Sequence, residues 1–194
     1  MSQIRTVHQK SDLRNTDSMK LFTNLRLRWH AYMLKKRMKQ LKVERSSIQF
    51  EKAKRIGIVF DATSLDNQAF AENYVQMLRK AGKRVDILAY VDDEQEHNNF
   101  PFKYFNQKDL SWYFHPKSDE VNQFIETPFD ILISLHLHDV LSLEYISALS
   151  HAKIRVGKYN ENKLHCYDLM IDGSKHEDLR NFIQQVDKNL KIMK

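Results

Sequence analysis

The sequence predicts an α/β fold in which a doubly wound, mostly parallel sheet of about five strands follows a long basic N-terminal helix. Three observations support this class. From Arg55 onwards, short apolar runs alternate with segments that are apolar at helical spacing, and the connections between them are short. Such alternation is typical of a Rossmann-like or flavodoxin-like sheet. From Ser18 to Val43 the chain has neither glycine nor proline, which favours one continuous helix.

The first half of the body has a β-α-β pattern. RIGIVF, residues 55–60, predicts a buried strand, and DNQAFAENYVQMLRKA predicts a helix that ends before Gly82. RVDILAYV predicts a second strand, which we expect to be parallel to the first and joined to it by a right-handed crossover. FKYF and SWYF are expected to be short edge strands.

The second half continues the alternation. SDEVNQFIE predicts a short helix that ends at Pro128, and FDILISL predicts a third buried strand. The remaining elements are expected to be a helix in LSLEYISALSHA, strands in KIRVGKY and YDLMI, and a C-terminal helix in HEDLRNFIQQVDKNLKIM.

Three regions are predicted. Residues 1–17 are polar and aperiodic and are expected to form a flexible tail. Residues 18–54 predict a basic amphipathic helical arm, with Ser18 as N-cap and a helix end near Val43, and residues 55–194 predict the α/β domain. One apolar stripe on the arm is too long to remain in water, so we expect the body or a partner to cover it. The stripe contains Leu27, Ala31, Leu34, Met38 and Leu41.

Charge is distributed unevenly along the chain. Residues 1–55 contain 15 Lys and Arg against four acids, a net charge of +11, whereas the remainder has a net charge of −5. This asymmetry predicts a basic arm that contacts a polyanion and a mildly acidic body that does not. The chain has one cysteine, no window that resembles a signal peptide and no apolar run long enough to span a bilayer. We therefore expect a cytoplasmic protein.

Several blocks in the body resemble a known family. KDLSWYF, PFDILISL, ISALSHAKIRVGKYNEN and YDLMID, in this order, are similar to an uncharacterised family of small Bacteroidota proteins, a domain of unknown function. This resemblance covers roughly residues 55–194 and implies no activity. FDILISL and AKIRVGKY are also faintly similar to the N-terminal half of heptosyltransferase-type glycosyltransferases. The chain has no room for the second, nucleotide-sugar-binding domain of those enzymes.

The ends of the predicted strands carry the candidate residues for a ligand pocket, because doubly wound sheets bind ligands there. Asp61, Thr63 and Ser64 follow the first strand, and His136 and His138 follow the third. No glycine-rich phosphate motif is present, so no nucleotide or other cofactor is expected. The two histidines are more typical of hydrogen-bonded side chains than of a metal site, and Ser64 or Asp66 is expected to cap the next helix.

No catalytic set is predicted. Cys166 follows His165 directly, but adjacent residues of a strand face opposite sides, so a buried structural thiol is favoured over a nucleophile and base. Asp92, Asp93 and Asp168 would form a carboxylate group only if their strand ends converged.

The arm carries the functional hypothesis. Residues 26–42 contain seven basic residues and no acid, which suits contact with RNA phosphates, for example on the ribosome, while the body acts as a protein-binding or positioning module. The alternatives are a peripheral membrane or membrane-complex adaptor that the helix anchors to an anionic membrane surface, and a small-molecule-binding protein or enzyme with a site at the carboxyl ends of the strands. Core packing is favoured for Trp29 and Tyr32, although either could stack on an unpaired base. The residues predicted to contact RNA are Arg26, Arg28, Trp29, Lys35, Lys36, Arg37, Lys39 and Lys42.

Overall fold

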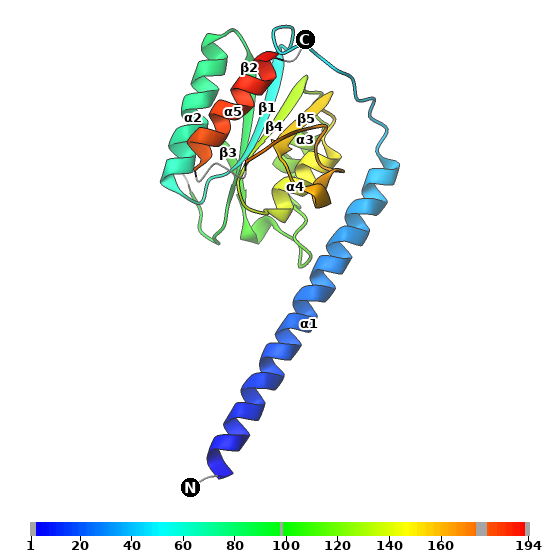
Figure 1. Cartoon of the computed structure of the whole chain (residues 1–194), viewed down its shortest axis with the longest axis vertical. Coiled ribbons are helices and arrows are strands. Elements are labelled where there is room, and N and C mark those ends of the chain that lie inside the picture. Colours follow the sequence, from blue (N-terminus) through cyan, green and yellow to red (C-terminus); the bar gives the residue numbers. More distant parts are fainter. Residues whose placement is uncertain (1–2, 98, 174–177, 193–194) are drawn as a thin grey trace.

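In the computed structural model, the chain has a three-layer body with one long helix, α1, along its side (Figure 1). The structure describes residues 3–97, 99–173 and 178–192, and it describes the side chains of α1 from Met19 onwards. The predicted α/β class is confirmed. No helix in the described part of the chain is both long and apolar enough to cross a membrane.

The central sheet has six strands, all parallel, in the order β3-β2-β1-β4-β5-β6. This is the strand order of the Rossmann fold, in which the chain reverses its direction of winding between β1 and β4. The sequence predicted about five strands, and the short edge strand β3 lies in the predicted FKYF segment. The strands are β1 Arg55–Asp61, β2 Arg84–Val91, β3 Lys103–Asn106, β4 Ile131–Leu135, β5 Ile154–Lys158 and β6 Leu169–Ile171.

The prediction of a strand in SWYF is wrong. Phe114 has a φ of 65°, which a strand cannot accommodate, and its N–H donates to the Ser111 carbonyl at 3.0 Å. The segment is therefore a turn, and it is flanked by an isolated antiparallel bridge between Leu110 and Pro116.

Helices cover both faces of the sheet (Figure 1). The helices α2 (Leu65–Lys80) and α5 (Leu179–Ile192) pack on one face, and α3 (Asp119–Glu126) and α4 (Leu141–Leu149) pack on the other. Short 3₁₀ turns lie at Gln107–Asp109 (η1) and Glu161–Lys163 (η2). The core is thus divided into two clusters by the sheet.

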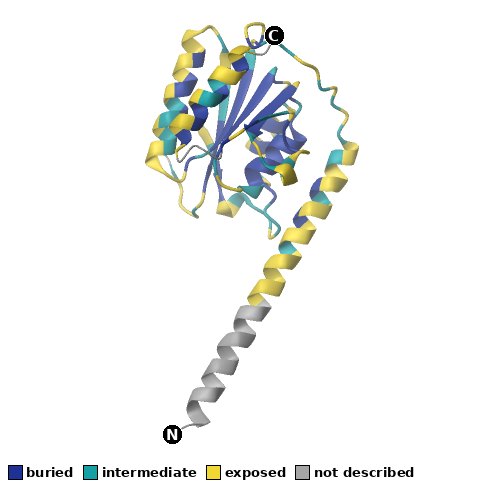
Figure 2. Cartoon of the chain, in the orientation of Figure 1, coloured by how far each residue is buried: buried dark blue, intermediate teal, exposed yellow. Residues whose placement is uncertain are grey.

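The strand β1 shows how alternation builds both clusters. Ile58 and Phe60 face α2 and α5, whereas Val59 faces α3 and α4, and all three are fully buried. The central strands are buried throughout in Figure 2, and a strand that is buried on both faces has an almost continuously apolar sequence. The predicted cap of α2 is Ser64, whose hydroxyl accepts from the Asn67 N–H at 3.2 Å.

The helix α1 (Gln3–Gln40) lies against the outer side of α4 and ends three residues before the predicted position. A linker then returns to β1 and is held by backbone contacts, including Ser46 N–H to the Lys153 carbonyl at 3.3 Å. The Lys83 ammonium also donates to three carbonyls near the linker's end. The prediction of Ser18 as N-cap is wrong, because α1 begins at Gln3 and Ser18 lies inside it. The side chains of the predicted tail, residues 1–17, are not described, and the division into tail, arm and domain stays a prediction.

One close approach in the sheet requires a glycine. A Cβ placed on Gly157, in β5, would lie far inside van der Waals contact of the Tyr167 ring. The Tyr167 ring therefore rests directly on the backbone of β5, which places its hydroxyl beneath the end of β4.

We expect Gly157→Ala to lower the free energy of unfolding by about 1–3 kcal/mol, because the buried ring must move to accept the methyl group. Urea denaturation measures this change. Gly173→Ala is the matched control: its added Cβ would meet only the flexible side chain of Lys158, at 3.0 Å, so a smaller loss is expected. Equal losses in the two variants would contradict the interpretation.

Candidate functional site

Two arginines and one histidine of α1 hold this helix on the body. The Arg26 guanidinium donates to the Trp112 carbonyl and lies 4.0 Å from the centre of the Phe114 ring. The Arg37 guanidinium donates to the buried Tyr145 hydroxyl of α4. His30 Nδ1 lies 3.1 Å from the Tyr113 carbonyl oxygen. Since a carbonyl only accepts hydrogen bonds, Nδ1 is the protonated nitrogen. Arg26 and Arg37 are therefore anchors of the helix and differ in role from the other predicted RNA contacts.

A pair of histidines is buried under α1. His30 and His115 meet edge to face, with ring centroids 4.7 Å apart, and His115 lies 4.1 Å from the Tyr145 ring. Burial lowers the pKa of His30, and it lowers the pKa of His115 to about 3, with further contributions from His30 and Arg37. The Nε2 atom of His115 has no hydrogen-bond partner among the described residues. Both rings are therefore neutral at physiological pH.

One exposed side of α1, next to the cleft between this helix and the body, is cationic. Three of its basic residues, Arg28, Lys35 and Lys39, are spaced by 7 and 4, which places them on one side of the helix, and Lys42 follows in the linker after the helix ends at Gln40. All four are exposed, and none of them forms an ion pair within the part of the chain that the structure describes. We call this surface the outer basic face; it comprises Arg28, Lys35, Lys39 and Lys42. Lys36 is exposed beside it.

An aromatic strip lies beside the outer basic face. The Trp29 and Tyr32 side chains are 42% and 59% exposed, so the core packing favoured from the sequence is wrong. Their ring centroids are 5.8 Å apart, and Trp29 lies 6.1 Å from Trp112 of the body, which is 47% exposed. Sequence reasoning missed Trp112 because it assigned SWYF to an edge strand. We call Trp29, Tyr32 and Trp112 the aromatic strip.

The residues predicted to form a ligand pocket lie together at the carboxyl edge of the sheet, at the switch point between β1 and β4. Most of their polar groups already form hydrogen bonds within the protein. Asp61 accepts from the Thr63 N–H at 3.0 Å and from the Thr63 hydroxyl at 2.6 Å, and Ser64 caps α2. Asp66, Asp92 and Asp93 belong to the same edge. The surplus of carboxylates there disfavours a phosphate ligand.

His136 is locked by two hydrogen bonds. Its Nδ1 donates to the His138 carbonyl at 2.7 Å, so its Nε2 accepts from the Tyr167 hydroxyl, which lies 3.0 Å away. Burial lowers the pKa of His136. The His138 side chain is exposed, and only the backbone carbonyl of His138 takes part in this hydrogen bond. The described residues contain no group of three or more potential ligands that could hold a metal.

The other candidates for chemistry also have structural partners. Cys166 is buried in the core, and burial raises the pKa of its thiol to about 12. Asp168 forms a bidentate ion pair with the buried Arg155, with oxygen to nitrogen distances of 2.8 and 2.9 Å. The Asp92 carboxylate accepts hydrogen bonds from the Tyr90 hydroxyl and the Gln107 amide. The Asp93 carboxylate pairs with the His97 ring at 2.9 Å. The three carboxylates therefore do not converge.

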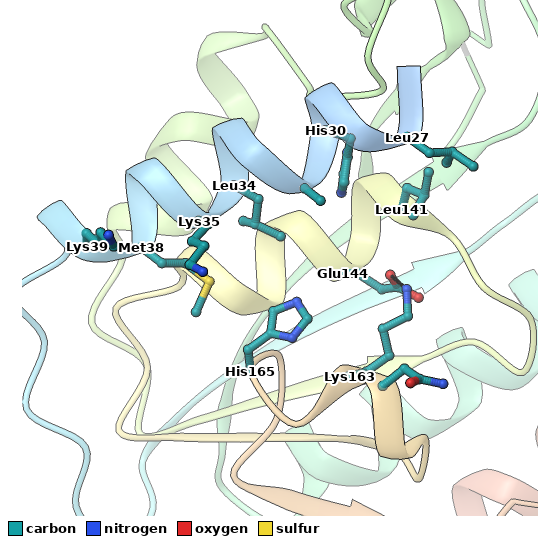
Figure 3. A pocket seen from close by; sticks show the side chains of 12 residues that line it. Leu27, His30, Leu34, Lys35, Met38, Lys39, Leu141, Glu144, Lys163 and His165 are labelled. Carbon is teal, nitrogen blue, oxygen red and sulfur yellow. Dashed lines mark hydrogen bonds and ion pairs between the residues drawn. The ribbon is translucent and has the colours of Figure 1, made fainter. Parts of the chain in front are cut away.

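A cleft of about 750 Å³ lies between α1 and the body (Figure 3). Its α1 wall is the predicted apolar stripe, and Leu141 of α4 faces that wall. Only Leu34 of the stripe is fully covered, at 4% exposed, whereas Leu27 is 41% exposed. The floor carries the ion pair between Glu144 and Lys163. The body thus covers part of the stripe, and the rest of it is exposed to solvent in the cleft.

Comparison with protein families gives a match to a family of unknown function, DUF6913, over residues 26–193. The chain belongs to this family. The DUF6913 match starts within α1 and so includes the part of the helix that packs on α4. It confirms the predicted membership in an uncharacterised family, while the bacterial group and the likeness to glycosyltransferases stay predictions. None of the curated proteins compared with this DUF6913 member matches its sequence.

We expect acid to destabilise the protein through the histidine pair. A folded-state pKa below the ordinary value of 6.5 means that the unfolded chain binds protons first as the pH falls. Stability is therefore complete above about pH 6.5 and is lost towards pH 3. For His115 the loss is about 2 kcal/mol by pH 5. Urea denaturation at about pH 7.5 and pH 5 measures it.

Other buried histidines titrate as well, so a variant isolates the contribution of this pair. His115→Phe keeps an aromatic ring against Tyr145 and removes the unpaired nitrogen, and it should reduce the pH dependence by about 2 kcal/mol. His138→Phe, at an exposed side chain, is the matched control and should leave the dependence unchanged. An unchanged pH dependence in His115→Phe would contradict the assignment.

Proposed function

We propose that the protein is a non-catalytic RNA-binding protein that associates with the ribosome, and that α1 makes the contact. The observation that carries the proposal is the outer basic face: three exposed cations on one side of α1 and a fourth directly after its end, with no acid between residues 26 and 42. Such a ladder suits the regular phosphates of a polyanion, and binding would release their counterions. The body then serves as a module that positions a further protein, in the cytoplasm.

The anchoring of α1 supports this proposal. Because Arg26 and Arg37 bind the body, the helix presents its other basic residues in a constant direction. From Arg28 to Lys39 the face extends about 16 Å along the helix axis. A rigid array of charges loses less conformational entropy on binding than a flexible tail with the same charges.

The aromatic strip indicates which part of an RNA is contacted. Trp29 lies between two other exposed rings, 5.8 Å from Tyr32 and 6.1 Å from Trp112, and exposed rings next to cations suit bases that are unpaired and free to stack. In a duplex the base faces are covered by their neighbours. We therefore favour loops and single-stranded segments of structured RNA.

A membrane surface is the second candidate, because α1 exposes Met19, Leu21, Phe22 and Leu25 beyond the body. An interfacial helix needs its apolar residues on one side and its charges on the other. Over its whole length α1 shows almost no such separation, which favours RNA. Sedimentation with anionic vesicles decides between the two. If the protein sediments with vesicles and never with RNA, α1 binds a membrane surface and the RNA proposal is wrong.

Salt dependence tests the phosphate contacts. If four phosphates of a single strand are neutralised, log affinity should fall with log salt with a slope of about −3. Changing Arg28, Lys36 and Lys42 to Glu should abolish co-sedimentation with ribosomes at moderate salt and leave the unfolding transition unchanged. Changing the exposed body lysines Lys103, Lys117 and Lys188 to Glu alters the net charge equally and should have little effect. Equal losses in both variants would indicate a non-specific effect of charge.

Tryptophan fluorescence tests the aromatic strip. The chain has two tryptophans, Trp29 and Trp112, and both belong to the strip, so stacking of oligouridine should quench the emission. Tyr32→Ala should weaken binding roughly 5- to 150-fold, which corresponds to about 1–3 kcal/mol per stacked base. Tyr159→Ala, an exposed tyrosine of the body, is the control. Salt-dependent binding without quenching would refute the stacking role and leave the phosphate contacts intact.

A further inference from the structure

The cleft between α1 and α4 has an unusual lining for a gap between two packed elements. Leu27, Ala31 and Leu34 form an apolar wall that continues to Met38, and Leu141 faces it. Apolar surface left exposed in a concave site is typical of ligand-binding pockets, and a volume of about 750 Å³ lies within their usual range. This observation is independent of the proposed contact with RNA.

The charges in the cleft select for an anion. Lys35 and Lys39 line the cleft at the end where Met38 lies, and neither forms an ion pair within the described residues (Figure 3). The one acid of the lining, Glu144, is already paired with Lys163 and is 4% exposed. The two free ammonium groups therefore face no carboxylate that could repel an anionic head group.

The shape of the cleft selects for an elongated ligand. Leu27 and Leu141 lie at one end, and Lys35, Met38 and Lys39 lie at the other (Figure 3). From Leu27 to Lys39 the helix axis rises about 18 Å. The two unpaired cations thus lie at one end of a long cleft with an apolar α1 wall, whereas Lys163, near the other end, is already paired with Glu144. A chain that carries an anionic head group would match this arrangement.

We propose that this cleft binds an amphipathic anion, with a linear hydrocarbon chain between α1 and Leu141 and a carboxylate or phosphate head at Lys35 and Lys39. The bound chain would remove Leu27 and Ala31 from water, which stabilises the complex by about 25 cal/mol for each Å² of apolar surface buried. The head group would make charge-assisted hydrogen bonds with the two ammonium groups.

Isothermal titration calorimetry with dodecanoate, below its critical micelle concentration, tests the proposal on the full chain. We expect one saturable site per chain and a concentration-dependent rise in the unfolding temperature, since a ligand that binds only the folded state stabilises it. Dodecyl phosphate should bind as well, because the two ammonium groups can donate hydrogen bonds to a phosphate as they do to a carboxylate. Dodecyltrimethylammonium has the same chain with a positive head, and equal binding of this compound would overturn the proposal.

Two variants locate the site. Ala31→Phe places a benzyl group in the cleft from an exposed position of α1, so it should abolish binding while the charges and the fold remain. Gln40→Phe adds the same group at an exposed position outside the cleft lining. This variant should bind dodecanoate with the same affinity as the unaltered chain. Replacing Lys35 and Lys39 with Gln should weaken the affinity for dodecanoate at least tenfold. Unchanged binding in Ala31→Phe, or binding without saturation, would overturn the proposal.

Discussion

Tyr145 lies where α1 meets the body, and its contacts determine how α1 is presented. Its side chain is fully buried, its hydroxyl accepts from Arg37, and its ring packs against His115. A hydrogen bond between a charged donor and a buried hydroxyl cannot be broken without leaving one group unsatisfied, which costs about 1–3 kcal/mol. This contact therefore sets the rotation of α1 about its axis. The outer basic face, the aromatic strip and the cleft all follow from that rotation.

The same rotation separates opposite charges over the molecule. The exposed cations of α1 lie beside α4, whereas Asp61, Asp66 and Asp92 gather at the carboxyl edge of the sheet. A polyanion that approaches is attracted by one region and repelled by the other, which restricts the orientations in which it can dock. The switch point of the sheet, the usual ligand site of this fold, is thus less suited to phosphates than α1 is.

The fold could be predicted from local patterns, because buried strands such as Ile56–Phe60 and the cap at Ser64 depend on neighbouring residues alone. The direction of side chains on α1 could not. Leu27 and Leu34 belong to one stripe in sequence, yet only Leu34 is covered, since coverage depends on α4, which is distant in the chain. Trp112 was missed for a related reason: a turn with a positive φ at Phe114 resembles an aromatic edge strand in sequence.

The contact between Arg37 and Tyr145 joins residues 108 positions apart. During synthesis, α1 leaves the ribosome long before α4 exists, so it spends that interval without its packing partner. Contacts of such large sequence separation form late, because a long loop must close before they contribute. The basic helix is therefore free on the nascent chain until β4 and α4 have been made, and it can dock only after that point.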